Sequence, residues 1–120
     1  MPLTIHHLPD YLLVAGDGLP TLADAQQHFR DLSTLLVAER RTGRRQVRVM
    51  IDLRRAHPHP PEVAAHIERA LPLLYKPGDR VAVIVASSTL KVDTKETHDP
   101  GFSQVFLSQR AAKEYLTRPG

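Results

Sequence analysis

The sequence predicts an α/β fold in which helices cover a mixed, mainly parallel β-sheet. Segments with the two-residue period of strands alternate with segments of helical period, in the order β-β-α-β-α-β-loop-β-α. Strands separated by helices are typical of parallel sheets with crossover connections. The first two strands are close enough to form a hairpin, which adds an antiparallel edge. The 120 residues are expected to form one domain, residues 1–120.

The first half of the chain begins with the hairpin and continues into the longest helix. Pro9 has no N–H to donate to a strand partner, so it belongs in the turn between residues 4–8 and 11–16. Thr21 is a suitable N-cap for the helix, and Gly43 is a suitable residue to end it. Apolar residues recur on one side of this helix at helical spacing: Leu22, Ala25, Phe29, Leu32 and Leu36.

The next elements are a strand, a shorter helix and a turn. Apolar and polar residues alternate over residues 45–55, which indicates a strand. Residues 61–74 have helical spacing, and Pro72 is expected to kink or end this helix because it cannot donate a backbone hydrogen bond. Residues 76–79, Lys-Pro-Gly-Asp, are typical of a turn. His28 and His66 lie beside the apolar stripes of the two helices, and we expect both at the surface.

The last third of the chain contains the strand that is expected to be most buried. Residues 80–88 are almost continuously apolar, which is typical of a strand covered on both faces. Residues 103–107 form a short strand, and residues 108–116 form an amphipathic helix with Ser108 as its cap. Residues 89–102 are polar and have weak periodicity, so we expect a loop there.

The composition excludes several classes of protein. The chain has no cysteine, so it contains no disulfide and no thiolate site. No run of about 18 apolar residues is present, so we expect no membrane span. The first ten residues lack the basic and apolar segments of a signal peptide. These features together predict a cytoplasmic protein.

Several segments resemble SpoIIAA-like proteins of the STAS superfamily. The likeness is carried by "MIDLRR" at residues 50–55, "DRVAVIVASS" at residues 79–88 and "VFLSQRAAKEYL" at residues 105–116. It spans nearly the whole chain, and stand-alone members of this kind are mostly uncharacterised bacterial proteins. The resemblance implies a layer of helices over a mixed sheet. It also implies that the protein acts by binding partners and is not an enzyme.

The resemblance also identifies one departure from the family pattern. The well-studied relatives antagonise anti-sigma factors and carry a phosphorylatable serine at the start of the second helix. This chain has "AHPHPPE" at residues 56–62, and no Ser or Thr occurs between Leu53 and Leu74. The resemblance therefore implies a regulatory protein-interaction domain that lacks the phosphoserine switch.

Polar residues at the carboxyl ends of the strands form the main candidate site. Ligands of open α/β sheets favour this edge, and arginine with the N–H groups of a helix start can hold an anion. We expect the binding surface to include the adjoining loop and the start of the second helix. Its candidate residues are Asp52, Arg54, Arg55, His57, His59, Glu62, Ser87 and Ser88.

These residues allow two other interpretations. His57 and His59 flank a proline and could ligate zinc or copper, but a closed site needs further ligands, so we expect no metal. We expect this loop to be a stiff, exposed connection that leads the chain into the second helix.

Seven arginines between residues 40 and 55 could attract nucleic acid. We expect no nucleic-acid partner, because the arginines at the two ends of the strand at residues 45–55 should lie at opposite edges of the sheet.

The sequence therefore predicts a non-enzymatic domain with no catalytic residue and no cofactor. Its partner would be a protein, which the sequence does not identify, and a homodimer is a further option. The alternative is a carrier of an apolar or anionic small molecule, with a pocket lined by Arg54, Ser87 and Ser88. A hydrolase would instead need a His within hydrogen-bond reach of a Ser or Asp in a cleft.

Overall fold

The computed structural model describes residues 3–18, 21–41, 46–56, 60–87 and 102–118. Its centre is one five-stranded sheet in which the strands follow their order in the sequence. The first two strands are antiparallel and the remaining neighbours are parallel, which confirms the predicted mixed, mainly parallel sheet. The strands are β1 (Leu3–His7), β2 (Leu12–Gly18), β3 (Arg48–Ala56), β4 (Arg80–Ile84) and β5 (Ser103–Phe106).

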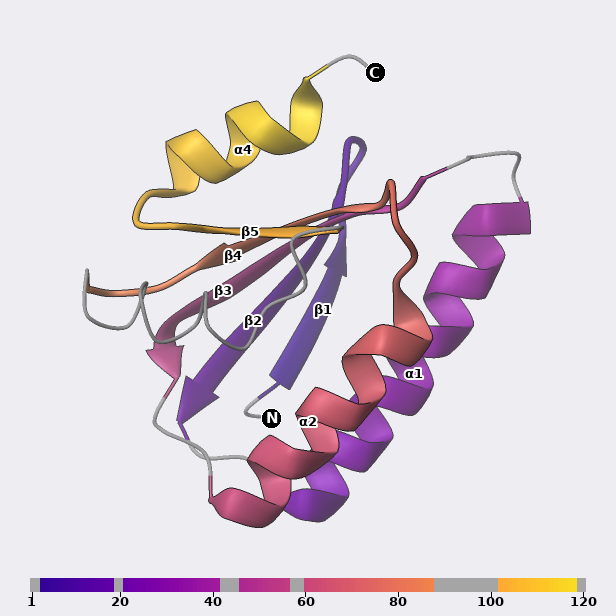
Figure 1. Cartoon of the computed structure of the whole chain (residues 1–120), viewed down its shortest axis with the longest axis vertical. Coiled ribbons are helices and arrows are strands. Elements are labelled where there is room, and N and C mark those ends of the chain that lie inside the picture. The colour runs from indigo at the N-terminus through magenta and orange to yellow at the C-terminus, as the bar shows by residue number, and fades with distance from the viewer. Residues whose placement is uncertain (1–2, 19–20, 42–45, 57–59, 88–101, 119–120) are drawn as a thin grey trace.

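Helices cover both faces of the sheet, as Figure 1 shows. The long helix α1 (Leu22–Arg41) and the helix α2 (Pro61–Leu74) lie side by side over one face. The helix α4 (Gln109–Thr117) lies on the opposite face, against β3, β4 and β5. The helices α1 and α2 each join one parallel strand to the next in the sheet, and right-handed crossovers that proceed in one direction place their helices on the same face. The helix α4 follows the last strand and is not part of a crossover.

Local sequence signals account for the helix boundaries. The Thr21 hydroxyl accepts a hydrogen bond from the Asp24 N–H, and the Asp24 carboxylate accepts one from the Thr21 N–H, which is a capping box. The Ser108 hydroxyl accepts from the Ala111 N–H and caps α4, as predicted. Pro61 begins α2, where no N–H is needed. Pro72 lies two residues before the end of that helix, as expected for a residue that cannot continue it.

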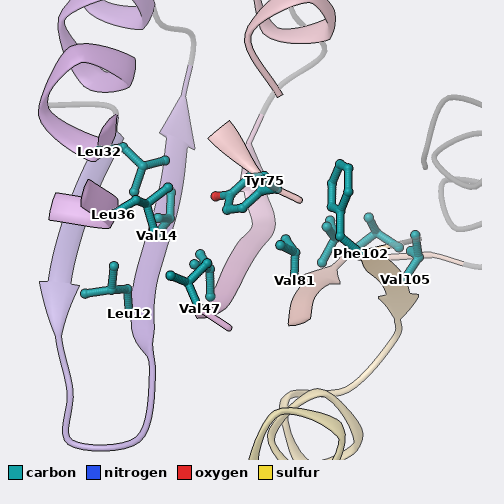
Figure 2. Packing of buried hydrophobic residues seen from close by; sticks show 12 residues of the cluster. Leu12, Val14, Leu32, Leu36, Val47, Tyr75, Val81, Phe102 and Val105 are labelled. Atoms are coloured by element: carbon teal, nitrogen blue, oxygen red, sulfur yellow. The ribbon is translucent and has the colours of Figure 1, made fainter. Parts of the chain in front are cut away.

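Two apolar clusters fill the spaces on the two sides of the sheet. The larger cluster lies beneath α1 and α2, and Figure 2 shows part of it. The smaller cluster lies between the sheet and α4 and contains Met50, Ala112 and Leu116. Successive residues of β4 alternate between the clusters, so both of its faces are buried, as the apolar run predicted. The regular strand ends at Ile84, before the predicted end at residue 88.

The environment of His28 corrects one prediction. This histidine was expected at the surface, but it is only 5% exposed. The prediction was wrong because α1 packs against both the sheet and α2, so its buried surface is wider than one apolar stripe. His66 is half-buried on α2, and its Nε2 atom is buried without a hydrogen-bond partner among the described residues. The predicted loop at residues 89–102 falls, apart from Phe102, outside the described residues.

Candidate functional site

The predicted strand-end site contains one well-defined ion pair. Arg54 donates to both carboxylate oxygens of Asp52, with the closest nitrogen and oxygen atoms 2.7 Å apart. The Arg54 guanidinium also donates to the side-chain oxygen of Gln109, at the start of α4, over 3.4 Å. Hydrogen bonding by Arg54 lowers the pKa of Asp52, although burial acts in the opposite direction. The pair therefore stays ionised, and it links β3 to α4.

The other described site residues differ in their relation to this pair. Arg55 follows Arg54 directly, so strand alternation places it on the opposite face of the sheet, although its positive charge also lowers the pKa of Asp52. Glu62 is exposed in the first turn of α2, and Ser87 is exposed beyond the end of β4. His57, His59 and Ser88 lie outside the described residues. Within the described chain, the structure brings together Asp52 and Arg54 and adds Gln109, which the sequence analysis did not select.

Among the described arginines, Arg40 lies near the start of β3 and Arg54 near its end, as predicted, whereas Arg44 and Arg45 fall outside the described residues. Arg40 bonds to Asp79, whose carboxylate also accepts from the Val47 N–H just before the strand begins. Arg54 lies seven residues beyond Val47, which corresponds to roughly 23 Å of extended chain. The arginines that are adjacent in sequence therefore do not form one continuous cationic surface in space.

A second candidate site is an apolar pocket between the sheet and the helices α1 and α2. Its volume is about 220 Å³. It lies on the face opposite α4, so it is separate from the pair formed by Asp52 and Arg54. The pocket is lined by Leu3, Val14, Gly16, His28, Phe29, Leu32, Ile51, Leu53, Ala64, Ile67, Glu68, Leu71, Tyr75 and Val83.

The exposure of the lining residues distinguishes the mouth of the pocket from its interior. Glu68 is exposed, and Leu3 and Leu53 are half-buried, so these residues mark the side that faces solvent. Leu32 and Tyr75 are buried and mark the inner end. A ligand that enters the pocket would therefore pass from a partly exposed rim to a floor that is shielded from water.

Three side chains bring polar groups to the pocket: His28, Glu68 and Tyr75. Burial lowers the pKa of His28, with Asp31 acting in the opposite direction, so the imidazole is neutral at neutral pH. The His28 and His66 rings both make edge contacts with Phe29, at centroid distances of 5.2 and 5.7 Å. The contact between Phe29 and His66 joins α1 to α2 beside the pocket.

The sequence analysis missed this pocket for a physical reason. Its lining residues come from strands β1 to β4 and from both helices on that face, or lie directly after α2. Apolar residues in such elements are expected in the core, and no local sequence pattern distinguishes a fully packed core from one that contains a cavity. The ligand-carrier alternative did predict a pocket, but at Arg54, Ser87 and Ser88. That location stays a prediction, because Ser88 lies outside the described residues.

The described part of the chain contains no cluster of three or more His, Cys, Asp or Glu side chains that could hold a metal ion. Within the same residues, no helix is long and apolar enough to cross a membrane.

Comparison with known proteins gives structural matches only. No protein-family model matches the chain, and no curated protein matches it. An uncharacterized protein of the DUF3478 family from Shewanella loihica PV-4, which has a SpoIIAA-like fold, shares 22% sequence identity with a TM-score of 0.65. The match covers 95% of this chain and 91% of that protein.

A second similar structure is the anti-sigma factor antagonist SpoIIAA in its unphosphorylated form. It shares 9% sequence identity with a TM-score of 0.61, over 92% of this chain and 93% of that protein. At these identities the likeness establishes the fold alone. Together with the strand order and the helix layers, it shows that this chain has a SpoIIAA-like fold.

Proposed function

We propose that this protein binds a small apolar molecule between its sheet and the helices α1 and α2. The observation that carries the proposal is the pocket of about 220 Å³, whose lining is almost entirely apolar. An apolar ligand that moves from water into such a site gains the free energy of burying its surface. The proposal agrees in kind with the alternative prediction of a small-molecule carrier, but it places the ligand in a different part of the fold.

The size and chemistry of the pocket limit what it can hold. A cavity of about 150 Å³ lined by aliphatic and aromatic side chains accepts benzene. Pockets for drug-sized ligands begin at about 300 Å³. The volume of about 220 Å³ is therefore suited to a molecule of one or two rings, or to a short chain. None of the described residues that line the pocket is Ser, Thr, Cys or Lys, which supports a binding role without a nucleophile. A cytoplasmic location is supported by the lack of cysteine in the sequence.

Filling the pocket tests this proposal. Ala64 lines the pocket from α2, whereas its neighbour Ala65 does not. Tetralin, a two-ring hydrocarbon, is the probe, and its dissociation constant is measured by titration calorimetry. We expect Ala64→Leu to weaken tetralin binding about tenfold or more, because the added side chain occupies the ligand volume.

Ala65→Leu is the matched control, since it makes the same substitution one residue further along the same helix. It should bind tetralin as the unmodified protein does, and circular dichroism should show both variants folded. A folded Ala64→Leu protein that binds tetralin with unchanged affinity would contradict the proposal, and so would a lack of tetralin binding by the unmodified protein.

Contact with a protein partner is the second candidate function. It is supported by the exposed charged residues Arg55 and Glu62 near the strand ends, and by the similarity to SpoIIAA, which is an anti-sigma factor antagonist. Arg55→Glu should abolish cross-links to a specific partner, whereas Arg110→Glu, on the exposed side of α4, should leave them intact. Equal cross-linking of both variants would count against a partner at this surface.

A further inference from the structure

The hydroxyl of Tyr75 is a buried polar group without a hydrogen-bond partner. Tyr75 is 3% exposed, and its Oη atom has no partner among the described residues. Most buried polar groups in folded proteins are hydrogen-bonded, because an unsatisfied donor loses its bonds to water without replacement. A buried orphan donor beside a pocket therefore indicates where a bound molecule would supply the missing acceptor.

The position of the ring directs this hydroxyl toward the pocket. The ring of Tyr75 packs against Phe102, with 5.4 Å between the centroids. Its oxygen points away from Phe102, toward the side chains of Val14 and Leu32, as Figure 2 shows. Val14 and Leu32 both line the pocket, and Leu32 is only 1% exposed. The hydroxyl thus lies at the inner, water-shielded end.

The protonation state of Tyr75 makes it a donor. Burial raises the pKa of its hydroxyl, and the nearby charge of Asp79 acts in the same direction while Arg40 opposes it. The group therefore keeps its proton at neutral pH. No Lys or Arg occurs among the described residues that line the pocket, and the exposed Glu68 lies at its mouth. An anionic ligand would be buried without a counter-charge, which is costly, so a neutral ligand is favoured.

We propose that the ligand is a neutral, apolar molecule with one acceptor oxygen, such as a ketone or an ester, which accepts a hydrogen bond from the Tyr75 hydroxyl. The molecule enters with its oxygen leading, and the apolar walls hold the remainder. This inference rests on the proposed function, and it adds the chemical feature that the pocket selects.

A matched pair of probes tests the selection. Tetralin and 1-tetralone have the same two-ring skeleton, and only 1-tetralone carries a carbonyl oxygen. Their dissociation constants are measured with the unmodified protein, with Tyr75→Phe, and with Tyr115→Phe on the opposite face as the control. We expect Tyr75→Phe to weaken 1-tetralone about fivefold, and to leave tetralin binding equal or stronger, because a neutral hydrogen bond contributes about this factor. Tyr115→Phe should change neither constant.

The carbonyl stretch of bound 1-tetralone gives a second readout that needs no variant. In the unmodified protein the band should lie below its frequency in cyclohexane, as hydrogen bonding requires, and it should return toward that value in Tyr75→Phe. If both probes bind but Tyr75→Phe affects them equally, and the band matches cyclohexane, the inference is overturned while the proposed function stands. If neither probe binds the unmodified protein, the proposed function fails and the inference fails with it.

Discussion

At the scale of single residues, His28 shows how burial sets the protonation state beside the pocket. Its imidazole lies between the helix layer and the sheet and is 5% exposed. Desolvation by burial lowers its pKa below the usual value, and Asp31 acts in the opposite direction without cancelling the effect. The neutral ring can therefore pack against Phe29 in the apolar layer.

The lowered pKa of His28 predicts a stability that depends on pH. Above about pH 6.5 the ring is neutral in both the folded and the unfolded chain, so it contributes no pH dependence. As the pH falls below that value, the unfolded chain takes up the proton first, and the free energy of unfolding decreases. The decrease ends once the pH lies below the pKa of the folded state.

Urea unfolding between pH 8 and pH 5 measures this effect. The difference in unfolding free energy between the unmodified protein and His28→Gln should shrink or reverse on acidification, because only the unmodified protein carries the penalty. His6→Gln, at an exposed position, controls for the loss of a histidine as such. A constant difference across this pH range would show that His28 does not titrate in this way.

At the scale of elements, one carboxylate joins parts of the chain that are far apart in sequence. Asp79 accepts two hydrogen bonds from Arg40, near the end of α1, at 2.7 and 3.2 Å. It also accepts from the Val47 N–H at 3.1 Å and from the Lys76 N–H at 2.8 Å. Arg40 in turn donates to the carbonyl of Leu74, at the end of α2. The turn before β4 is thereby held to the ends of both helices and to the start of β3.

The geometry of this turn depends on Gly78, whose φ angle of 97° is one that residues with a side chain rarely adopt.

The contacts of Asp79 also set its protonation state. Burial alone would raise the pKa of Asp79, but the hydrogen bonds from Arg40, Lys76 and Val47 outweigh it, and the pKa lies below its ordinary value. The carboxylate contributes stability above the pKa of the unfolded chain and loses it as the pH falls through the folded-state pKa.

Removing this carboxylate should destabilise the fold strongly. Asp79→Ala removes the carboxylate that pairs with Arg40, and it leaves the backbone N–H groups of Val47 and Lys76 without their acceptor. We expect the free energy of unfolding to fall by about 3 kcal/mol, which is typical when one partner of a buried pair is lost. The measurement is chemical denaturation at pH 7.

The control for this variant removes an acid from an exposed pair. Glu114 pairs with Arg110 one turn away on α4, and both side chains are largely exposed. Glu114→Ala should therefore change the free energy of unfolding by less than about 0.5 kcal/mol. Equal effects of the two variants would show that the Asp79 contacts do not bind the elements together.

At the scale of the whole molecule, the two faces of the sheet are packed differently. The face under α4 is closed by a small apolar cluster. The other face supports a larger cluster, yet the space enclosed by the sheet, α1 and α2 retains a pocket of about 220 Å³. A cavity of this kind costs stability, because its lining loses packing contacts. An apolar ligand in the pocket would restore such contacts, so this face of the sheet is well suited to bind one.

Much of this architecture follows from local signals that can be recognised along the chain. Alternation in β3, the apolar run of β4 and the capping residues Thr21 and Ser108 each depend on a few neighbouring residues. The same alternation rule divides the predicted site, because it places Arg54 and Arg55 on opposite faces. That division follows from the sequence alone, because it depends only on the two-residue period of a strand.

The amino-acid order determined the sequence of the described elements, the N-terminal caps of α1 and α4, and the apolar face of each helix. Tertiary structure decided the burial of His28, the partners of Asp79, and the pocket with the Tyr75 hydroxyl at its inner end. The physical reason is the range of the interactions. Periodicity and capping act over one or two turns, whereas a cavity or a buried ion pair depends on how separate elements pack, and residues such as Arg40 and Asp79 become neighbours only when the layers form.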